Sequence, residues 1–335
     1  MNNTNTTEVF QGIQPFTPSG ENIAAAFFVS LLIIMTLVGN GLVFASFYMF
    51  TDLRTICNYF IVSLSLADIL VALLAMPFWL QLQLSSNRWV LSKGLKMFWD
   101  CIDILGGTAS ITNLTAVSVD RMLAITVPFK YPKLVTSRRA LVVIACVWIY
   151  AISVSCARTA QWPGRSFLIF VSIVCFFLPL SIVILMYMVI FFVVRTQVKR
   201  IGKNHANEMK AAKTIAVVIG GFLVCWLPFF TVILGHAFST TFRPPFALFN
   251  VIKWLEYFNS CLNPIIYTCM NRTYRRAFKR LFRRCYFKLY PSGEGNTVVS
   301  QYLSQGPRGS LLTTTVYDHH DSNGHQHDHN KQDKL

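Results

Sequence analysis

Seven apolar segments dominate this 335-residue chain, and each is long enough to cross a lipid bilayer as a helix. They lie near residues 22–49, 58–84, 95–127, 138–158, 166–195, 212–237 and 245–269. Charged residues make up only 13% of the chain, whereas soluble domains carry roughly 25%. The alternating patterns of about ten residues that build membrane barrels are absent from the sequence. The sequence therefore predicts an all-α membrane protein with a seven-helix bundle.

Basic residues are distributed unevenly between the two faces of this predicted bundle. About twenty Lys and Arg lie in or beside the loops and tail segment after the first, third, fifth and seventh spans, and about seven lie on the other face. Because cytoplasmic loops carry the excess of Lys and Arg, we expect a multi-pass plasma-membrane protein with its N-terminus outside. Asn2 and Asn5 each begin a predicted N-glycosylation sequon in the N-terminal segment.

Composition divides the chain into four expected parts. These are an extracellular segment (1–21), the membrane domain (22–270), an amphipathic juxtamembrane helix (271–286) and a disordered cytoplasmic tail (287–335). The juxtamembrane helix interleaves basic and apolar residues, so membrane lipids are its expected partner and Cys285 is a candidate for palmitoylation. The net charge of +16 gathers at the membrane edges, so no nucleic-acid partner is expected.

Polar side chains inside two of the spans indicate where function lies. The run W-L-E-Y-F-N-S-C-L-N-P-I-I-Y at 254–267 carries a carboxylate, two asparagines and Pro264, which removes a backbone donor and kinks a helix. Asp103 and Arg121 are eighteen residues apart, which places them on one face of a helix and about 27 Å from each other. Such residues face a bundle interior, as an ion conduit or as a line of signal transmission from an outer pocket.

Motifs in all seven spans resemble those of one receptor family. They are G-N-G-L-V at 39–43, L-R-T-I-C-N-Y-F-I-V-S-L-S-L-A-D at 53–68, D-R-M-L-A-I-T-V-P-F-K-Y at 120–131, E-M-K-A-A-K-T-I at 208–215, F-L-V-C-W-L-P-F-F at 222–230 and N-P-I-I-Y at 263–267, with Trp148 and Pro179 between them. The chain resembles the rhodopsin-like (class A) G-protein-coupled receptors. Asp103 and the run W-L-x-Y-F-N-S at 254–260 are similar to the biogenic-amine receptors within that family.

This resemblance implies a small cationic ligand outside and a heterotrimeric G protein inside. A protonated amine would bind the Asp103 carboxylate, with hydroxyl groups and aromatic ring faces around it. The candidate ligand-binding residues are Asp103, Tyr257, Trp226, Phe229, Phe230, Trp254, Thr108, Ser172 and Glu256. The tail is a candidate contact for arrestin and a receptor kinase.

The resemblance also implies an ion site and an activation switch below the ligand. The candidate ligands of an allosteric sodium ion, the one cofactor expected, are Asp68, Ser110, Asn259, Ser260 and Asn263. The candidate switch residues are Asp120, Arg121, Glu208, Pro179, Ile111, Phe222, Pro264 and Tyr267. A latch of Arg121 with Asp120 and Glu208 would open on activation, and Arg121 and Phe129 would contact the G protein.

Several positions depart from the family pattern. Lys96 stands where the family has the cysteine of its outer disulfide, and the second outer loop has none. Cys101 and Cys156 could pair only if packing brings them together. Lys253 and Glu256 add a base and a second acid near Asp103, which either neutralise each other or select a ligand unlike the familiar monoamines.

Other function classes stay open at this stage. A class A receptor for a peptide or a lipid is the first alternative, and an ion or solute transporter is a more distant one, since no inverted repeat is visible. A light receptor is disfavoured because Tyr257 occupies the position of the retinal-bearing lysine. The sequence shows no nucleophile paired with a base, no metal motif and no phosphate loop, so it does not suggest an enzyme.

Overall fold

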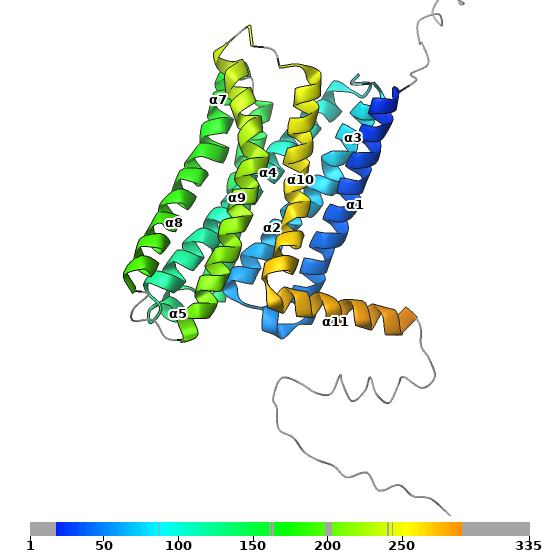
Figure 1. Cartoon of the computed structure of the whole chain (residues 1–335). Helices are drawn as coiled ribbons and strands as arrows, with labels where there is room; N and C mark the ends of the chain where they lie inside the picture. The colour runs from blue at the N-terminus through cyan, green and yellow to red at the C-terminus, as the bar shows by residue number, and fades with distance from the viewer. Residues whose placement is uncertain are drawn as a thin grey trace, which may run out of the picture. The chain divides into compact units, whose positions relative to one another are not determined.

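A computed structural model describes residues 18–86, 88–160, 162, 164–197, 203–239, 241–242 and 244–289, with side chains at 194, 196–197, 203–215, 285 and 287–289 excepted. The described part is helical and contains no strand. In chain order its elements are α1 (Gly20–Met49), η2 (Thr51–Leu53), α2 (Ile56–Leu74), α3 (Met76–Leu84), α4 (Lys93–Thr126), α5 (Tyr131–Leu134), α6 (Ser137–Cys156), η3 (Ala157–Thr159), α7 (Gly164–Val171), η4 (Ser172–Phe177), α8 (Leu178–Gln197), α9 (Lys203–Phe238), α10 (Phe246–Met270) and α11 (Arg272–Leu289). Figure 1 shows the long helices side by side.

Two of the predicted spans are each built from more than one helical element. The second span joins α2 to α3 at Ala75, two residues before Pro77. The fifth span joins α7 to α8 through the π-helical turn η4, which ends two residues before Pro179. Proline has no backbone N–H and clashes with the carbonyl four residues earlier, so the helix must re-register there.

By length and composition alone, six helical segments of the described chain could cross a membrane. In this count α2 and α3 form one segment, and α7, η4 and α8 form another. Of the seven predicted spans, the one that does not meet this criterion is α10, whose 25 residues include Lys253, Glu256, Asn259 and Asn263. All four side chains are buried in the bundle. The prediction of seven spans therefore differs from a hydropathy criterion only at α10, where polar groups face inward rather than toward lipid.

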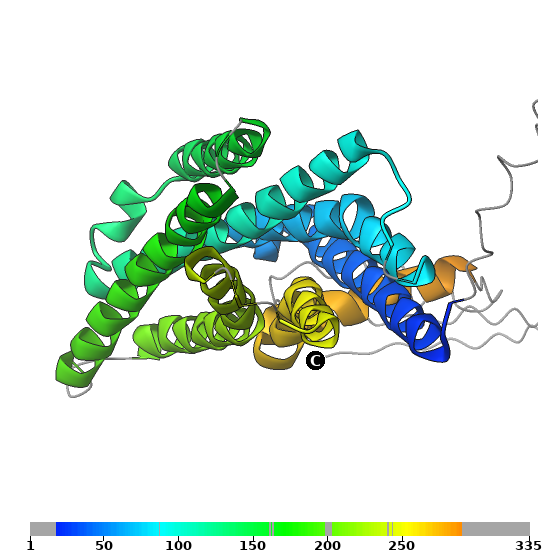
Figure 2. The ribbon, with the colours of Figure 1, turned by 90° about the horizontal axis from the view of Figure 1, so that it is seen from above.

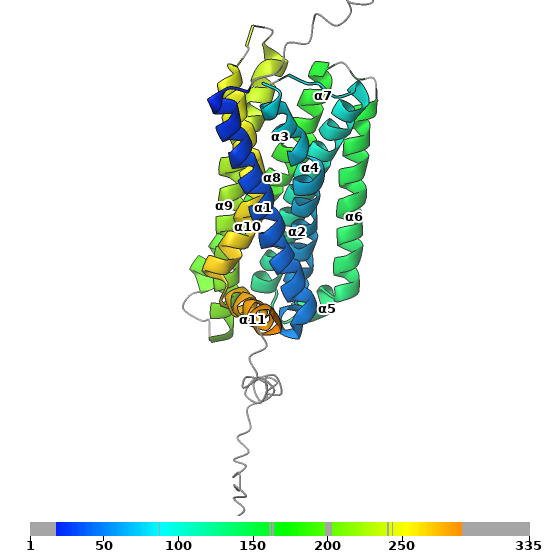
Figure 3. The same ribbon diagram turned by 90° about the vertical axis from the view of Figure 1, so that its right-hand side faces the viewer.

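The long helix α4 lies at the centre of the packing. It contacts α2, α6, α8 and α9, and Figures 2 and 3 show the bundle from above and from the side. Glycine permits two close approaches on α4, because a Cβ added to Gly107 would lie 2.6 Å from the Trp226 ring of α9 and one added to Gly106 would overlap the Val71 side chain of α2. Asp103 and Arg121 both lie on α4, and α10 packs against α1, α2 and α9.

Residues up to Arg283 form one compact unit, and of the second unit only residues 284–289 are described. Within the first unit, α11 begins after Asn271, whose side-chain oxygen accepts from the backbone N–H of Thr273 at 2.9 Å. The Tyr274 ring stacks on Tyr267 of α10 with 5.6 Å between centroids. The side chain of Cys285 and the residues Asn2 and Asn5 lie outside the described part, so palmitoylation and glycosylation there stay predictions.

Candidate functional site: a charged cluster between α4 and α10

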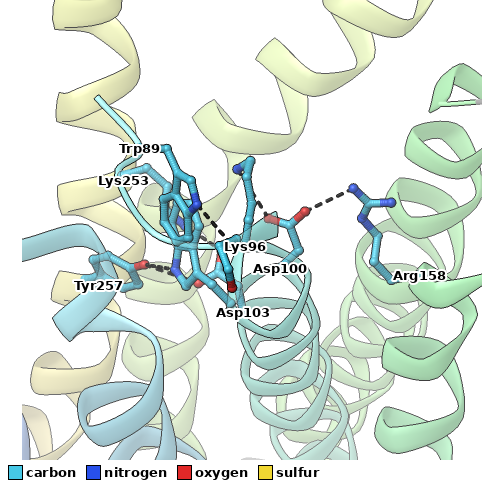
Figure 4. Close-up of polar contacts among 9 residues, drawn as sticks. Trp89, Lys96, Asp100, Asp103, Arg158, Lys253 and Tyr257 are labelled. Atoms are coloured by element: carbon cyan, nitrogen blue, oxygen red, sulfur yellow. Dashed lines mark hydrogen bonds and ion pairs between the residues drawn. The ribbon is translucent and has the colours of Figure 1, made fainter. Parts of the chain in front are cut away.

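Four polar side chains meet in the half of the bundle that is predicted to be outer, one from α4 and three from α10. The Lys253 ammonium donates to Asp103 Oδ2 at 2.5 Å and to Glu256 Oε2 at 2.9 Å. The Tyr257 hydroxyl donates to Asp103 Oδ1 at 3.3 Å (Figure 4). Lys253, Glu256 and Tyr257 share one face of α10 because they are three and four residues apart, and that face is turned to α4. We call these four residues the charged cluster.

Aromatic rings surround the ammonium of Lys253. Its Nζ lies 4.6 Å from the ring centroid of Tyr257, 5.5 Å from Phe229 and 5.7 Å from Trp99. Trp99 also donates from its indole N–H to the Tyr257 hydroxyl at 3.3 Å. Ring faces and carboxylates together are the groups that bind ammonium ions in proteins. Lys253 is 2% exposed, so these neighbours take the place of water around its ammonium.

A cavity of about 40 Å³ lies beside the charged cluster. Six of the predicted ligand-binding residues line it, and Tyr257 lines a smaller cavity next to it. The six are Asp103, Thr108, Trp226, Phe229, Phe230 and Glu256. This volume holds a few water molecules, so a ring-bearing ligand requires the aromatic side chains to move.

Two predicted ligand-binding residues are not among the described residues that line either cavity. Ser172 is buried and its hydroxyl donates to the carbonyl of Leu168, one turn earlier, at 2.7 Å. Trp254 packs edge-on against Phe28 of α1, with 5.4 Å between ring centroids. Phe176 does line the larger cavity and was missed; its ring stacks on Phe230 at 4.3 Å. Its signal in the sequence is its position one helical turn after Ser172 on an otherwise apolar segment.

A second polar group lies deeper, between α2, α4 and α10. The Asn263 side chain donates to Asp68 Oδ2 at 2.9 Å, and the other Asp68 oxygen has no protein partner within the described part of the chain. Ser110 and Ser260 line the smaller cavity, and Asn259 is buried. All five predicted sodium ligands are thus buried oxygen-bearing side chains, the donor type that hard cations prefer.

The predicted apolar switch residues are buried in the bundle. Ile111 of α4 and Phe222 of α9 are buried in one hydrophobic cluster, and Pro179 is buried at the start of α8. The Phe222 ring stacks on Trp226 with 5.7 Å between centroids. Pro264 and Tyr267 are buried in the inner half of α10. The cavity floor and the predicted switch are therefore in direct contact through Trp226.

At the inner end of α4, Arg121 and Asp120 form a buried ion pair. Arg121 Nη2 lies 2.6 Å from Asp120 Oδ2, and the Tyr131 hydroxyl of α5 donates to Asp120 Oδ1 at 2.7 Å. Burial, with the Asp120 carboxylate beside it, raises the pKa of Tyr131, so the hydroxyl keeps its proton and remains a donor. The side chain of Glu208 lies outside the described part, so its contact with Arg121 stays a prediction. Phe129 is 95% exposed.

A network of charges and rings lies where the family disulfide is expected. Arg158 of η3 bonds to Asp100 of α4 at 3.0 Å, and Lys96 lies 3.8 Å from the same carboxylate (Figure 4). The Lys96 ammonium lies 5.3 Å from the centroid of Trp89, whose ring stacks on Trp99 at 5.6 Å. Cys101 and Cys156, whose pairing the sequence left open, are both free thiols. Non-covalent contacts therefore join α4 to the start of the second outer loop.

The family follows from comparison with known proteins. The model of the 7 transmembrane receptor (rhodopsin family) matches residues 39–267. The chain belongs to this family. The receptor is therefore a multi-pass membrane protein with a seven-helix bundle, and membership of a receptor family agrees with the expectation that it is not an enzyme.

Named relatives support the resemblance to biogenic-amine receptors. The receptor is 31% identical over 322 residues to the human alpha-1D adrenergic receptor, a match that covers 77% of this chain and 56% of the relative. It is 32% identical to the alpha-1D adrenergic receptor of Sus scrofa with the same coverage. It is 29% identical to the alpha-1A adrenergic receptor of Oryzias latipes, over 83% of this chain and 71% of the relative. The chain thus spans little more than half the length of the alpha-1D relatives.

Proposed function

We propose that the receptor binds a small cationic, biogenic-amine-like ligand at Asp103 from outside the cell and activates a heterotrimeric G protein inside. The observation that carries this proposal is the Asp103 carboxylate at a cavity whose walls include Trp226, Phe229 and Phe230. An ammonium ion that enters a low-dielectric site loses its hydration, and a carboxylate with aromatic faces replaces that hydration. The names of the adrenergic relatives support the same ligand class.

The inner half of the bundle supports the G-protein part of the proposal. Arg121 is held by Asp120 and reaches the cytoplasmic end of α4, while the exposed Phe129 ring offers an apolar contact on the neighbouring loop. Movement of α9 away from α4 would free Arg121 for a partner, and Glu208 on α9 is the proposed second half of that latch. Arrestin and a receptor kinase are proposed partners of the tail, which lies outside the described residues.

Sodium is proposed as an allosteric ion at Asp68. The free oxygen of Asp68, with Ser110, Asn259, Ser260 and Asn263 nearby, supports a site for a hard monovalent cation. A cation there would stabilise the arrangement in which α2 and α10 are close together. Sodium would then lower the affinity for an agonist that favours the opposite arrangement.

The orientation of the receptor in the plasma membrane is also proposed. The excess of Lys and Arg after the odd-numbered spans supports an extracellular N-terminus. The basic residues of α11 support a contact with anionic lipid headgroups, because they alternate with buried apolar side chains such as Phe278 and Leu281.

The experiment is a panel of biogenic amines applied to cells that express the receptor with G-protein dissociation sensors. We expect at least one monoamine to produce dissociation in receptor-expressing cells and none in control cells. Arg121→Ala should abolish that response while surface expression is unchanged. A panel that gives no response, together with a response to a peptide or lipid fraction, would overturn the amine assignment and leave the receptor family intact.

A further inference from the structure

The receptor fills an amine-type site with its own lysine. The ammonium of Lys253 is bound by two carboxylate oxygens and lies within 4.6 Å of the Tyr257 ring centroid. Asp103 already accepts from Lys253 and from Tyr257 before any ligand is present. An incoming cation therefore does not meet an unpaired carboxylate at Asp103. This site differs from one in which a single acid binds an amine.

The formal charges of the cluster do not cancel. With both carboxyl groups ionised, Asp103 and Glu256 carry two negative charges and Lys253 carries one positive charge, which gives a formal charge of −1 between α4 and α10. The nearest other ion pairs in the described outer half join Asp100 to Lys96 and Arg158, so those cations are engaged elsewhere. A buried net charge is costly unless another charge balances it. The cluster therefore favours the arrival of one further cation.

The cavity lies against the carboxylates rather than against the lysine. Asp103 and Glu256 line both cavities, and Lys253 is not among the described residues that line either one. Its ammonium is enclosed by Trp79, Trp99 and Tyr257. A cation in the larger cavity can therefore contact both carboxylates without displacing Lys253. Such a cation would complete an arrangement of two positive and two negative charges.

We propose that Lys253 and Glu256 set the ligand charge that the receptor accepts. This rests on the proposed amine function and adds its specificity. The site takes a ligand with one positive charge and no acidic group beside it, whose ammonium bridges Asp103 and Glu256 on the side away from Lys253. A zwitterion is rejected, because its carboxylate returns the buried cluster to a net negative charge next to two acids.

A charge series tests this proposal with phenethylamine as the monocation and phenylalanine as the matched zwitterion. Binding is measured by thermal shift of the full-length receptor in lipid nanodiscs at neutral pH. The parent has a cluster charge of −1, Glu256→Gln has 0, and the double variant Lys253→Met/Glu256→Gln returns to −1 with Asp103 alone. The double variant is the control for folding, because it contains the Glu256→Gln change and keeps the favourable charge.

We expect the parent to bind phenethylamine and to bind phenylalanine at least tenfold more weakly. Glu256→Gln should weaken phenethylamine binding by about 30-fold or more, because Lys253 then neutralises Asp103 and the cluster has no net negative charge left for the ligand. The double variant should recover to within about threefold of the parent, since its charge is restored.

Two results would overturn the proposal while the amine function stands. One is Glu256→Gln binding phenethylamine as the parent does, which would make Lys253 and Glu256 a self-neutralising pair without effect on the ligand. The other is preferential binding of phenylalanine that Lys253→Met abolishes, which would make Lys253 the partner of a ligand carboxylate. If neither the parent nor the double variant binds phenethylamine and the amine panel gives no G-protein response, the proposed function fails, and this inference with it.

Discussion

The substitution Asp103→Asn removes one charge from the cluster with almost no change of shape. The oxygen of the introduced amide would still accept a hydrogen bond, and Lys253 would keep Glu256 at 2.9 Å, so we expect the variant to fold. The cluster charge rises from −1 to 0. Loss of a buried, hydrogen-bonded charge partner costs about 2–5 kcal/mol, which corresponds to about 30-fold to several thousand-fold in affinity for a cationic agonist.

The assay for Asp103→Asn is competition binding and G-protein dissociation with the amine that activates the parent. Expression at the cell surface controls for folding, and Asp52→Asn controls for the loss of an exposed carboxylate far from the cavity. We expect Asp52→Asn to leave affinity unchanged. An Asp103→Asn affinity within threefold of the parent would refute the role of this carboxylate, because loss of a carboxylate that contacts the ammonium is expected to cost about 30-fold or more.

Three other predictions concern the inner end, the deep polar group and the outer end. Arg121→Ala should retain agonist binding and lose nucleotide exchange, whereas Glu208→Ala should raise basal exchange; normal exchange in the first variant contradicts the latch. Asp68→Asn should abolish the effect of sodium on agonist affinity, and equal sodium sensitivity in both proteins removes the ion site. Arg158→Asp should lower the melting temperature, and the swap Asp100→Arg/Arg158→Asp should restore it, with a coupling of about 1 kcal/mol or less for this partly exposed pair; a swap that melts like the single variant rules out the pair.

The sequence predicted the helices and the relative depths of Asp103 and Arg121, because both follow from spacing along one chain. Eighteen residues of helix put Asp103 and Arg121 at opposite depths of α4, and the structure has them in one continuous helix. The i, i+3 spacing of Lys253 and Glu256 likewise predicted their contact, found at 2.9 Å. The bond from Lys253 to Asp103 joins residues 150 positions apart, so it depends on how α10 is rotated against α4 and could not be read from either helix alone.

Helix rotation and local backbone geometry explain why Trp254 lies away from the cavity and why Phe176 and Tyr131 were missed. Trp254 follows Lys253 directly, so it is turned about 100° away on the helix and meets Phe28 on α1 instead of the cavity. Phe176 enters the cavity wall from η4, where the π-helical turn changes the register that regular spacing would give. Tyr131 lies in a short helix of an inner loop, and only the folded loop brings its hydroxyl to Asp120.

The sequence indicated that the outer disulfide of the family is missing, but it did not specify which contacts replace that disulfide. Lys96 takes the cysteine position, and its charge is shared between Asp100 and the faces of Trp89 and Trp99. Arg158 then connects Asp100 to η3. Charges at partly exposed positions are screened by salt, whereas a disulfide is not. The stability of the outer end of this receptor should therefore depend on ionic strength and should not change with reducing agents.

The polar content of α10 is the property that links the outer site to the inner one. Two of the groups that lower its hydropathy are bonded to other helices: Lys253 to α4 near the outer end, and Asn263 to α2 at mid-depth. Below Asn263, Pro264 interrupts the backbone hydrogen bonds of α10, and Tyr267 stacks on the first turn of α11. These bonds offset the cost of polar groups in the membrane only while the helices keep this arrangement. A cation that bound between Asp103 and Glu256 would act on α10, the helix that also carries Asn263 and Tyr267. The polar residues that make α10 a poor membrane span therefore connect it to both ends of the bundle.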